Sequence, residues 1–246
     1  MPQDHSAFQR ISSAGEDSRR RGEGRWILFD PVFFLYVTII ALTPLPLGSF
    51  RPWSASLAEV LLGLCAVFWG GAVLRRPGTA GVSWRRLMVP TILYGMALAW
   101  GAFQRVPLAP VGWVHPDWSQ AEAALGPLPG RVSMAPSTGY ESLLQLVAGG
   151  VAFWLAVQMG RAPHRARRMV ETLALVSGAI AFYGLIVYLS GAETIFWLEK
   201  WAYRGDLTAT LVNRNHYATL AGLGLLCAVA AILGRWRREG GEGICA

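Results

Sequence analysis

Long apolar stretches dominate this chain and leave few folds open to it. Six of them can be marked, at residues 31–47, 54–74, 87–103, 143–159, 170–189 and 216–233. A helix rises about 1.5 Å per residue, so stretches of this length match the roughly 30 Å hydrocarbon core of a bilayer. The stretches therefore predict an all-α fold, a polytopic transmembrane helical bundle of about six spans.

The composition supports a membrane class and argues against a nucleic-acid-binding one. Hydrophobic residues make up 53% of the 246 residues and charged residues only 15%, against about 25% charged in soluble domains. A net charge of +7 would suggest nucleic acid in a soluble protein. In this chain the arginines fall at the ends of apolar stretches, so membrane topology explains them better. We expect a lipid bilayer as partner and no nucleic acid.

The connections between the stretches alternate in their arginine content. Three regions are rich in arginine: Arg75, Arg76, Arg85 and Arg86; Arg161, Arg165, Arg167 and Arg168; and Arg235, Arg237 and Arg238. The intervening connections are poorer in cations for their length. By the positive-inside rule both termini are cytoplasmic. The chain is thus divided into a disordered cytoplasmic tail (1–29), a transmembrane domain (30–235) and a cytoplasmic tail (236–246).

Two connections on the predicted extracytoplasmic side are rich in aromatic residues. The long connection 104–140 carries Trp113 and Trp118 among prolines, as expected of a segment against the lipid headgroups. The segment 193–203 carries four more aromatic residues. We predict that this segment is a short amphipathic helix lying in the membrane interface.

The segment 213–218, Asn-Arg-Asn-His-Tyr-Ala, stands where the last apolar stretch begins. Asn215 is a good N-cap for a helix that starts at His216. The free N–H groups and positive dipole end of such a helix favour anions, phosphate included. A cap plus a headgroup anchor is an equally simple interpretation of these residues.

The predicted outer face offers several cations near the membrane plane, from which the candidate substrate-binding residues are taken: Lys200, Arg204, Arg214 and Arg105. Arg204 and Arg214 are our candidates for contact with a lipid diphosphate, because the planar guanidinium forms two parallel hydrogen bonds to oxygens. Asn213 and Asn215 would hold the loop and the helix start. The alternative for each arginine is a side chain that anchors a helix end. His216 is a candidate general base, or else a polar residue hydrogen-bonded between helices.

Three strings of the sequence resemble the O-antigen ligase and O-antigen polymerase-like membrane proteins. They are the segment 207–218 (Leu-Thr-Ala-Thr-Leu-Val-Asn-Arg-Asn-His-Tyr-Ala), the segment 104–110 (Gln-Arg-Val-Pro-Leu-Ala-Pro) and the segment 133–138 (Ser-Met-Ala-Pro-Ser-Thr). Ala209 stands where Gly is common in that family, and Leu211 where an aromatic residue is common. The resemblance covers about residues 30–235.

The resemblance implies transfer of a glycan from undecaprenyl diphosphate to an acceptor, without metal or other cofactor, at the outer face of the bacterial inner membrane. It does not separate ligase from polymerase. The family's main catalytic Arg and His residues lie after further spans, so we expect this chain to be the N-terminal part of such an enzyme, with a truncated tail at 236–246. The later spans would come from a second fragment or protomer.

Two alternatives stay open. One is a non-catalytic membrane subunit that binds a lipid-linked glycan, and the other is a small transporter. A transporter is expected to carry polar residues in the centres of its spans or a repeat between its halves. The centres of the apolar stretches here are almost purely apolar, which disfavours a transporter.

Overall fold

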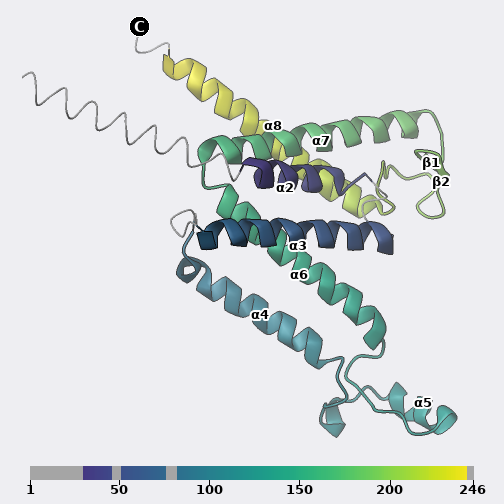
Figure 1. Ribbon diagram of the computed structural model, residues 1–246. Coiled ribbons are helices and arrows are strands. Elements are labelled where there is room, and N and C mark those ends of the chain that lie inside the picture. The colour runs from purple at the N-terminus through teal and green to yellow at the C-terminus, as the bar shows by residue number, and fades with distance from the viewer. Residues whose placement is uncertain (1–29, 46–50, 76–81, 243–246) are drawn as a thin grey trace, which may run out of the picture.

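The computed structural model describes residues 30–45, 51–75 and 82–242. Within them the chain is an all-α polytopic bundle with one small hairpin (Figure 1). Its elements are α2 (Asp30–Leu42), α3 (Pro52–Arg75), the 3-10 turn η3 (Trp84–Leu87), α4 (Met88–Phe103), the 3-10 turn η4 (Val111–Trp113), α5 (Asp117–Leu125), α6 (Pro136–Met159), α7 (Pro163–Leu189), the strands β1 (Thr194–Ile195) and β2 (Leu198–Glu199), and α8 (Arg214–Glu242).

Five of these helices are long and apolar enough to cross a membrane: Pro52–Arg75, Arg85–Phe103, Pro136–Met159, Pro163–Leu189 and Arg214–Arg237. The remaining predicted span, 31–47, is the first in the chain and corresponds to α2, which has only 13 residues. At about 1.5 Å per residue that is about 20 Å, too short to cross alone. The prediction of about six helical membrane segments is confirmed, with the first of them shorter than expected.

The helix bounds differ from the predicted spans where a proline sets the start. Pro136 begins α6 and Pro163 begins α7, each seven residues before the predicted span. Proline suits the first helical turn because the N–H it lacks would have no partner there. At its other end α7 stops before Gly191, whose φ of 70° is left-handed and whose N–H bonds to the Tyr188 carbonyl at 3.1 Å.

The predicted tails fare differently. Residues 1–29 and 243–246 lie outside the described residues. Residues 236–242 of the predicted C-terminal tail continue α8 as helix. A helix that extends past the apolar stretch is compatible with a cytoplasmic tail, so that assignment stays a prediction.

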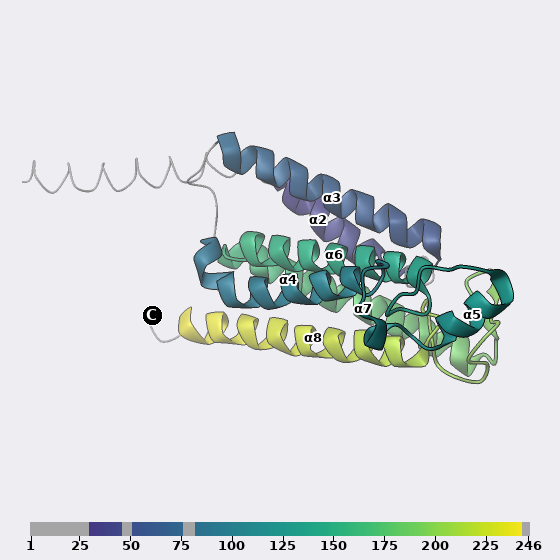
Figure 2. The ribbon, with the colours of Figure 1, turned by 90° about the horizontal axis from the view of Figure 1, so that it is seen from below.

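The long helices run roughly side by side and alternate in direction, as Figure 2 shows. The end of α3, the start of α4, the α6–α7 junction and the end of α8 lie at one end; we call this the basic end. The turn 43–45, the start of α3 and the connections 104–135 and 190–213 lie at the opposite end, here called the loop end. The start of α2 and the end of α8 both lie at the basic end, as the predicted topology requires.

Two clusters of buried apolar side chains hold the helices together. The larger lies between α2, α3 and α6 and consists of Phe33, Tyr36, Ile39, Leu62, Cys65, Leu155 and Met159. Tyr36 ties α2 to α6 through its hydroxyl, which donates to the Ala152 carbonyl at 2.8 Å. The smaller cluster joins α7 to the segment before α8 through Ile180, Ala209 and Leu211.

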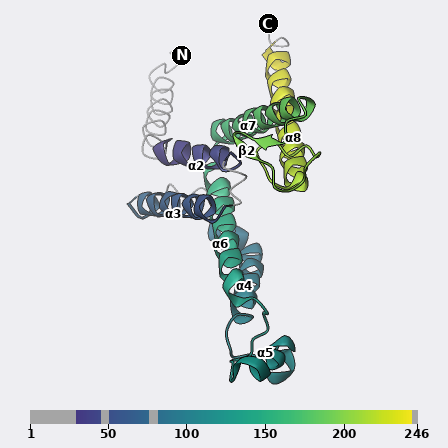
Figure 3. The ribbon, with the colours of Figure 1, turned by 90° about the vertical axis from the view of Figure 1, so that its right-hand side faces the viewer.

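The pair α7 and α8 stands at one side of the bundle and α4 at the other (Figure 3). The two helices approach closely at Gly224, where an added Cβ would lie 2.3 Å from the Ser177 Cβ. Small residues permit this kind of close approach between membrane helices. The closely packed pair α7 and α8 therefore holds both ends of the connection between them, residues 190–213.

Candidate anion site at the loop end

The segment 207–213 directly precedes α8, and its middle is buried. Thr208, Ala209, Thr210 and Leu211 are all less than a tenth exposed. The Thr210 hydroxyl donates to the Pro44 carbonyl at 2.9 Å, which attaches the segment to the connection after α2. The segment is thus held from two sides, by α7 and by the 43–45 turn.

Ala209 and Gly184 explain how the segment fits against α7. Ala209 has a φ of 49°, in the left-handed region where Gly is favoured. Its Cβ would lie 2.6 Å from a Cβ added at Gly184. Only a glycine at position 184 leaves room for this backbone.

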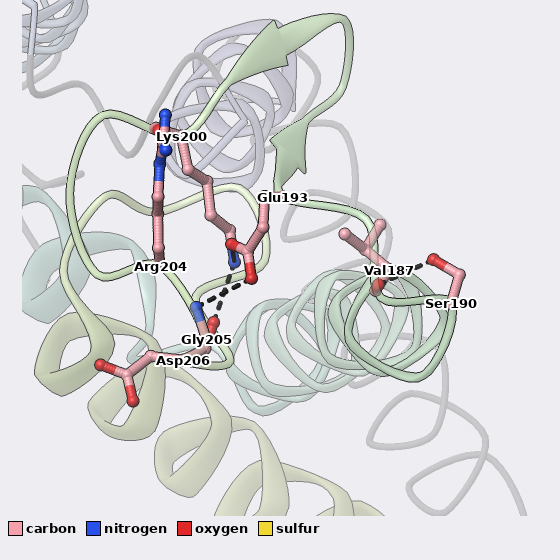
Figure 4. Close-up of polar contacts among 7 residues, drawn as sticks. All are labelled: Val187, Ser190, Glu193, Lys200, Arg204, Gly205 and Asp206. Carbon is pink, nitrogen blue, oxygen red and sulfur yellow. Dashed lines mark hydrogen bonds and ion pairs between the residues drawn. The ribbon is translucent and has the colours of Figure 1, made fainter.

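Residues 193–206 form a loop closed by a buried lysine (Figure 4). The Lys200 ammonium is 4% exposed, donates to the Asp206 carbonyl at 2.9 Å and pairs with the Glu193 carboxylate at 3.6 Å. The other Glu193 oxygen accepts from the Gly205 N–H at 2.8 Å. Lys200 was among the cations expected near the membrane surface, but its charge is used inside the loop. The result is a fixed position for Asp206.

Arg214 is the first residue of α8 and projects toward that loop. Its guanidinium pairs with the Asp206 carboxylate at 3.2 Å and lies 5.8 Å from the centre of the Tyr203 ring. The side chain is still 59% exposed. An exposed guanidinium at the positive end of a spanning helix is suited to bind an anion.

The predicted N-cap of α8 is wrong by two residues. The helix begins at Arg214, not at His216, and the cap is Asn213. The Asn213 side-chain oxygen accepts the Asn215 N–H at 2.8 Å. Both asparagines can accept such a bond, so residue type alone does not decide between them. Asn215 therefore lies in the first turn, with its own side chain exposed.

Arg204 does not share the partners of Arg214. Its Nε donates to the Lys200 carbonyl at 2.9 Å. Figure 4 shows the Arg204 side chain directed away from the Asp206 carboxylate, which is the partner of Arg214. The two predicted substrate-binding arginines thus lie on different elements, Arg204 on the loop 193–206 and Arg214 at the start of α8, and their guanidinium groups have different partners.

His216 is exposed and stands two residues after Arg214 in the helix. Residues two apart on a helix do not face each other. The proposed base and the proposed anion-binding arginine therefore lie on different faces of α8. The role of His216 as general base stays a prediction.

The structure adds Arg51 and separates Arg105 from the group. Arg51 precedes α3, and its guanidinium lies 5.1 Å from the centre of the Trp201 ring. It lies directly before α3, whose start is at the loop end, and in the sequence it already stood in the connection between the first two apolar stretches. Arg105 instead donates to the Pro136 carbonyl at 2.7 Å and lies over Tyr140, between α4 and α6.

The prediction of an amphipathic helix at 193–203 is wrong. The segment contains the antiparallel strands β1 and β2, with Ile195 opposite Leu198. Phe196 and Trp197 form the turn between them. Its aromatic residues remain exposed, with Trp197 at 85%. The 104–135 connection, for its part, contains the short helix α5.

A concave region away from these loops lies between α4 and α6. It has a volume of about 450 Å³ and is lined mainly by apolar side chains, among them Pro90, Tyr94, Leu146, Phe153 and Trp154. The Tyr94 hydroxyl donates to the Leu146 carbonyl at its edge. Within the described residues no three His, Cys, Asp or Glu side chains are placed to hold a metal ion.

No protein-family model, curated protein or solved structure matches this chain in sequence or structure comparisons. What the chain can do is therefore argued from its residues and geometry. Those define the class of a multi-pass membrane protein with a cationic, aromatic loop end.

Proposed function

We propose that this protein binds a lipid-linked diphosphate glycan at its loop end and takes part in glycan transfer from undecaprenyl diphosphate, as O-antigen ligases and polymerases do. Under this proposal the loop end faces the outer side of a bacterial inner membrane, because the arginine-rich connections stay in the cytoplasm. A lipid diphosphate carries its charge at the depth where the spanning helices end.

The observation that carries the proposal is the environment of Arg214. This side chain is exposed, stands at the start of a spanning helix and is oriented by Tyr203 and Asp206. A cation already held in place loses little side-chain freedom when an anion binds. In a transfer reaction the same guanidinium would neutralise the charge that grows on the leaving diphosphate.

A second candidate function is a non-catalytic subunit that binds the lipid-linked glycan. It is favoured by the divergence of Arg214 and His216 on α8 and by the separate contacts of Arg204. A transferase must hold donor, acceptor and base in one geometry, and errors of about 1 Å cost on the order of a hundredfold in rate. Arg214 and its neighbours support only one part of such a site, the part that binds the donor diphosphate.

Binding of undecaprenyl diphosphate to the purified protein in nanodiscs tests the proposal. Loss of hydrogen bonds to a charged group costs roughly 1.5–3 kcal/mol, so Arg214→Ala should weaken binding about tenfold or more. Arg214→Lys keeps the charge but loses the fork and should fall between. Arg237→Ala, an exposed arginine of the same helix at the basic end, is the matched control. Equal binding by all four proteins would leave Arg214 as a helix anchor only.

A further inference from the structure

The β1–β2 hairpin has an apolar tip that is held against α7. The Phe196 N–H donates to the Tyr183 hydroxyl at 2.7 Å, and the two rings stack with centres 5.1 Å apart. Phe196 has a φ of 53°, a conformation that is strained for a residue with a side chain. These two contacts with α7 fix the turn in that conformation. Beside it the Trp197 side chain is 85% exposed.

The depth of the tip follows from the charge pattern of α7. Arg167, Arg168 and Glu171 occupy its first turns, and the eighteen residues 172–189 carry no charge. These residues span about 27 Å, close to the roughly 30 Å of a hydrocarbon core. The core must therefore extend to the end of α7 at Leu189.

Tyr183 lies inside that apolar length. It precedes Leu189 by six residues, or about 9 Å along the helix. Helical side chains lean toward the N-terminal end, which in α7 is the basic end, so the Tyr183 ring does not rise toward the loop end. The Phe196 ring stacked on it then lies below the headgroups, at the level of the acyl chains.

Some of the backbone groups of the hairpin have partners of the kind that this location requires. In hydrocarbon a backbone donor must find a partner within the protein. The turn N–H of Phe196 has one in the Tyr183 hydroxyl, and the strands pair with each other. The charged residues Glu193, Lys200 and Glu199 stand at the base of the hairpin. Glu193 and Lys200 pair with each other, and Glu199 is exposed on the second strand opposite Thr194, at the end of the hairpin away from the tip.

We propose that the hairpin 194–199 is a membrane anchor whose tip, Phe196 and Trp197, inserts among the acyl chains of the leaflet at the loop end. The anchor fixes the adjoining loop 200–206 at headgroup level. Aromatic residues are the usual side chains at this depth. This inference concerns the lipid surface itself and does not depend on which substrate the protein binds.

Spin labelling of the full chain in liposomes measures the depth directly. In a background with Cys65, Cys227 and Cys245 replaced by Ala, a label on Trp197→Cys should be reached by dissolved oxygen more than by a water-soluble nickel chelate. A label on Glu199→Cys, on the exposed second strand, should show the reverse. Equal access of the chelate to both positions would overturn the proposal. A label at 197 shielded from both reagents would also overturn it, because it would mean that protein covers the tip.

A second measurement needs no cysteine replacement. The fluorescence that Trp197→Phe removes from the wild-type protein belongs to Trp197, and lipids brominated on their acyl chains should quench that difference strongly. Trp113→Phe, which removes an exposed tryptophan of the 104–135 connection, is the matched comparison. If acyl-chain bromine leaves the Trp197 difference unquenched, the tip is not in the membrane. Neither readout involves a diphosphate, so failure of the anchor and failure of the proposed function are separate results.

Discussion

Gly184 offers the sharpest test of how the 207–213 segment is held. A Cβ at position 184 would lie 2.6 Å from the Ala209 Cβ and 3.1 Å from the Ala209 Cα. Neither atom belongs to a flexible side chain, so the backbone of the segment has to move. Overpacking of this kind costs about 1–3 kcal/mol.

Gly178 is the matched control, because it lies on the same helix and an added Cβ there meets nothing within 4 Å. Both Gly→Ala changes gain the same helix propensity, roughly 1 kcal/mol. The difference in the free energy of unfolding between Gly184→Ala and Gly178→Ala therefore isolates the clash. We expect Gly184→Ala to be the less stable by about 1–3 kcal/mol, measured by thermal or denaturant unfolding in detergent.

A rescue makes the test specific. Ala209→Gly removes the clashing Cβ and relieves the left-handed strain at φ 49°, worth about 1–2 kcal/mol. Gly184→Ala combined with Ala209→Gly should regain part of the lost stability, and the double-mutant cycle gives the coupling. Equal stability of Gly184→Ala and Gly178→Ala would refute the close packing of the segment against α7.

Two further predictions follow from the charges. Asp206→Asn keeps a side-chain oxygen that can orient Arg214 but removes the negative charge that competes with the diphosphate. Since exposed ion pairs are worth about 0.2–1 kcal/mol, diphosphate affinity should rise roughly 1.5- to 5-fold; no rise, or a rise matched by the equal charge change Glu199→Gln, would contradict this. For topology, Ser119→Cys should react with a membrane-impermeant thiol reagent in intact cells, whereas His164→Cys, exposed at the basic end, should react only after lysis; labelling at 164 in sealed cells would reverse the orientation.

The sequence predicted the helices well because hydropathy is a local property. A run of apolar residues such as 170–189 must bury its backbone polar groups in a helix wherever it meets lipid. Residue type also predicted that an arginine would stand at the start of the last spanning helix. The ends of the helices were less well predicted, since Asn213 and Asn215 are equally good caps.

The hairpin shows why the rest could not be predicted. Residues 194–199 have no local signal for a turn at Phe196, a residue that disfavours positive φ. The turn is fixed by the hydroxyl and ring of Tyr183, which belongs to the preceding helix. Likewise, the sequence predicted that Lys200 lies at the surface, whereas the loop 193–206 buries its side chain.

The sequence by itself thus determined the class of the protein, the places of its spanning helices and the cations available at each end. Tertiary structure decided the partners and exposure of those cations: Arg214 pairs with Asp206 but stays 59% exposed, Arg204 donates to the Lys200 carbonyl, and Lys200 is buried. The physical reason is the distance along the chain between the residues that interact. Helix formation in lipid depends on consecutive residues, whereas each of these contacts requires a loop held in place by α7 and by the 43–45 turn.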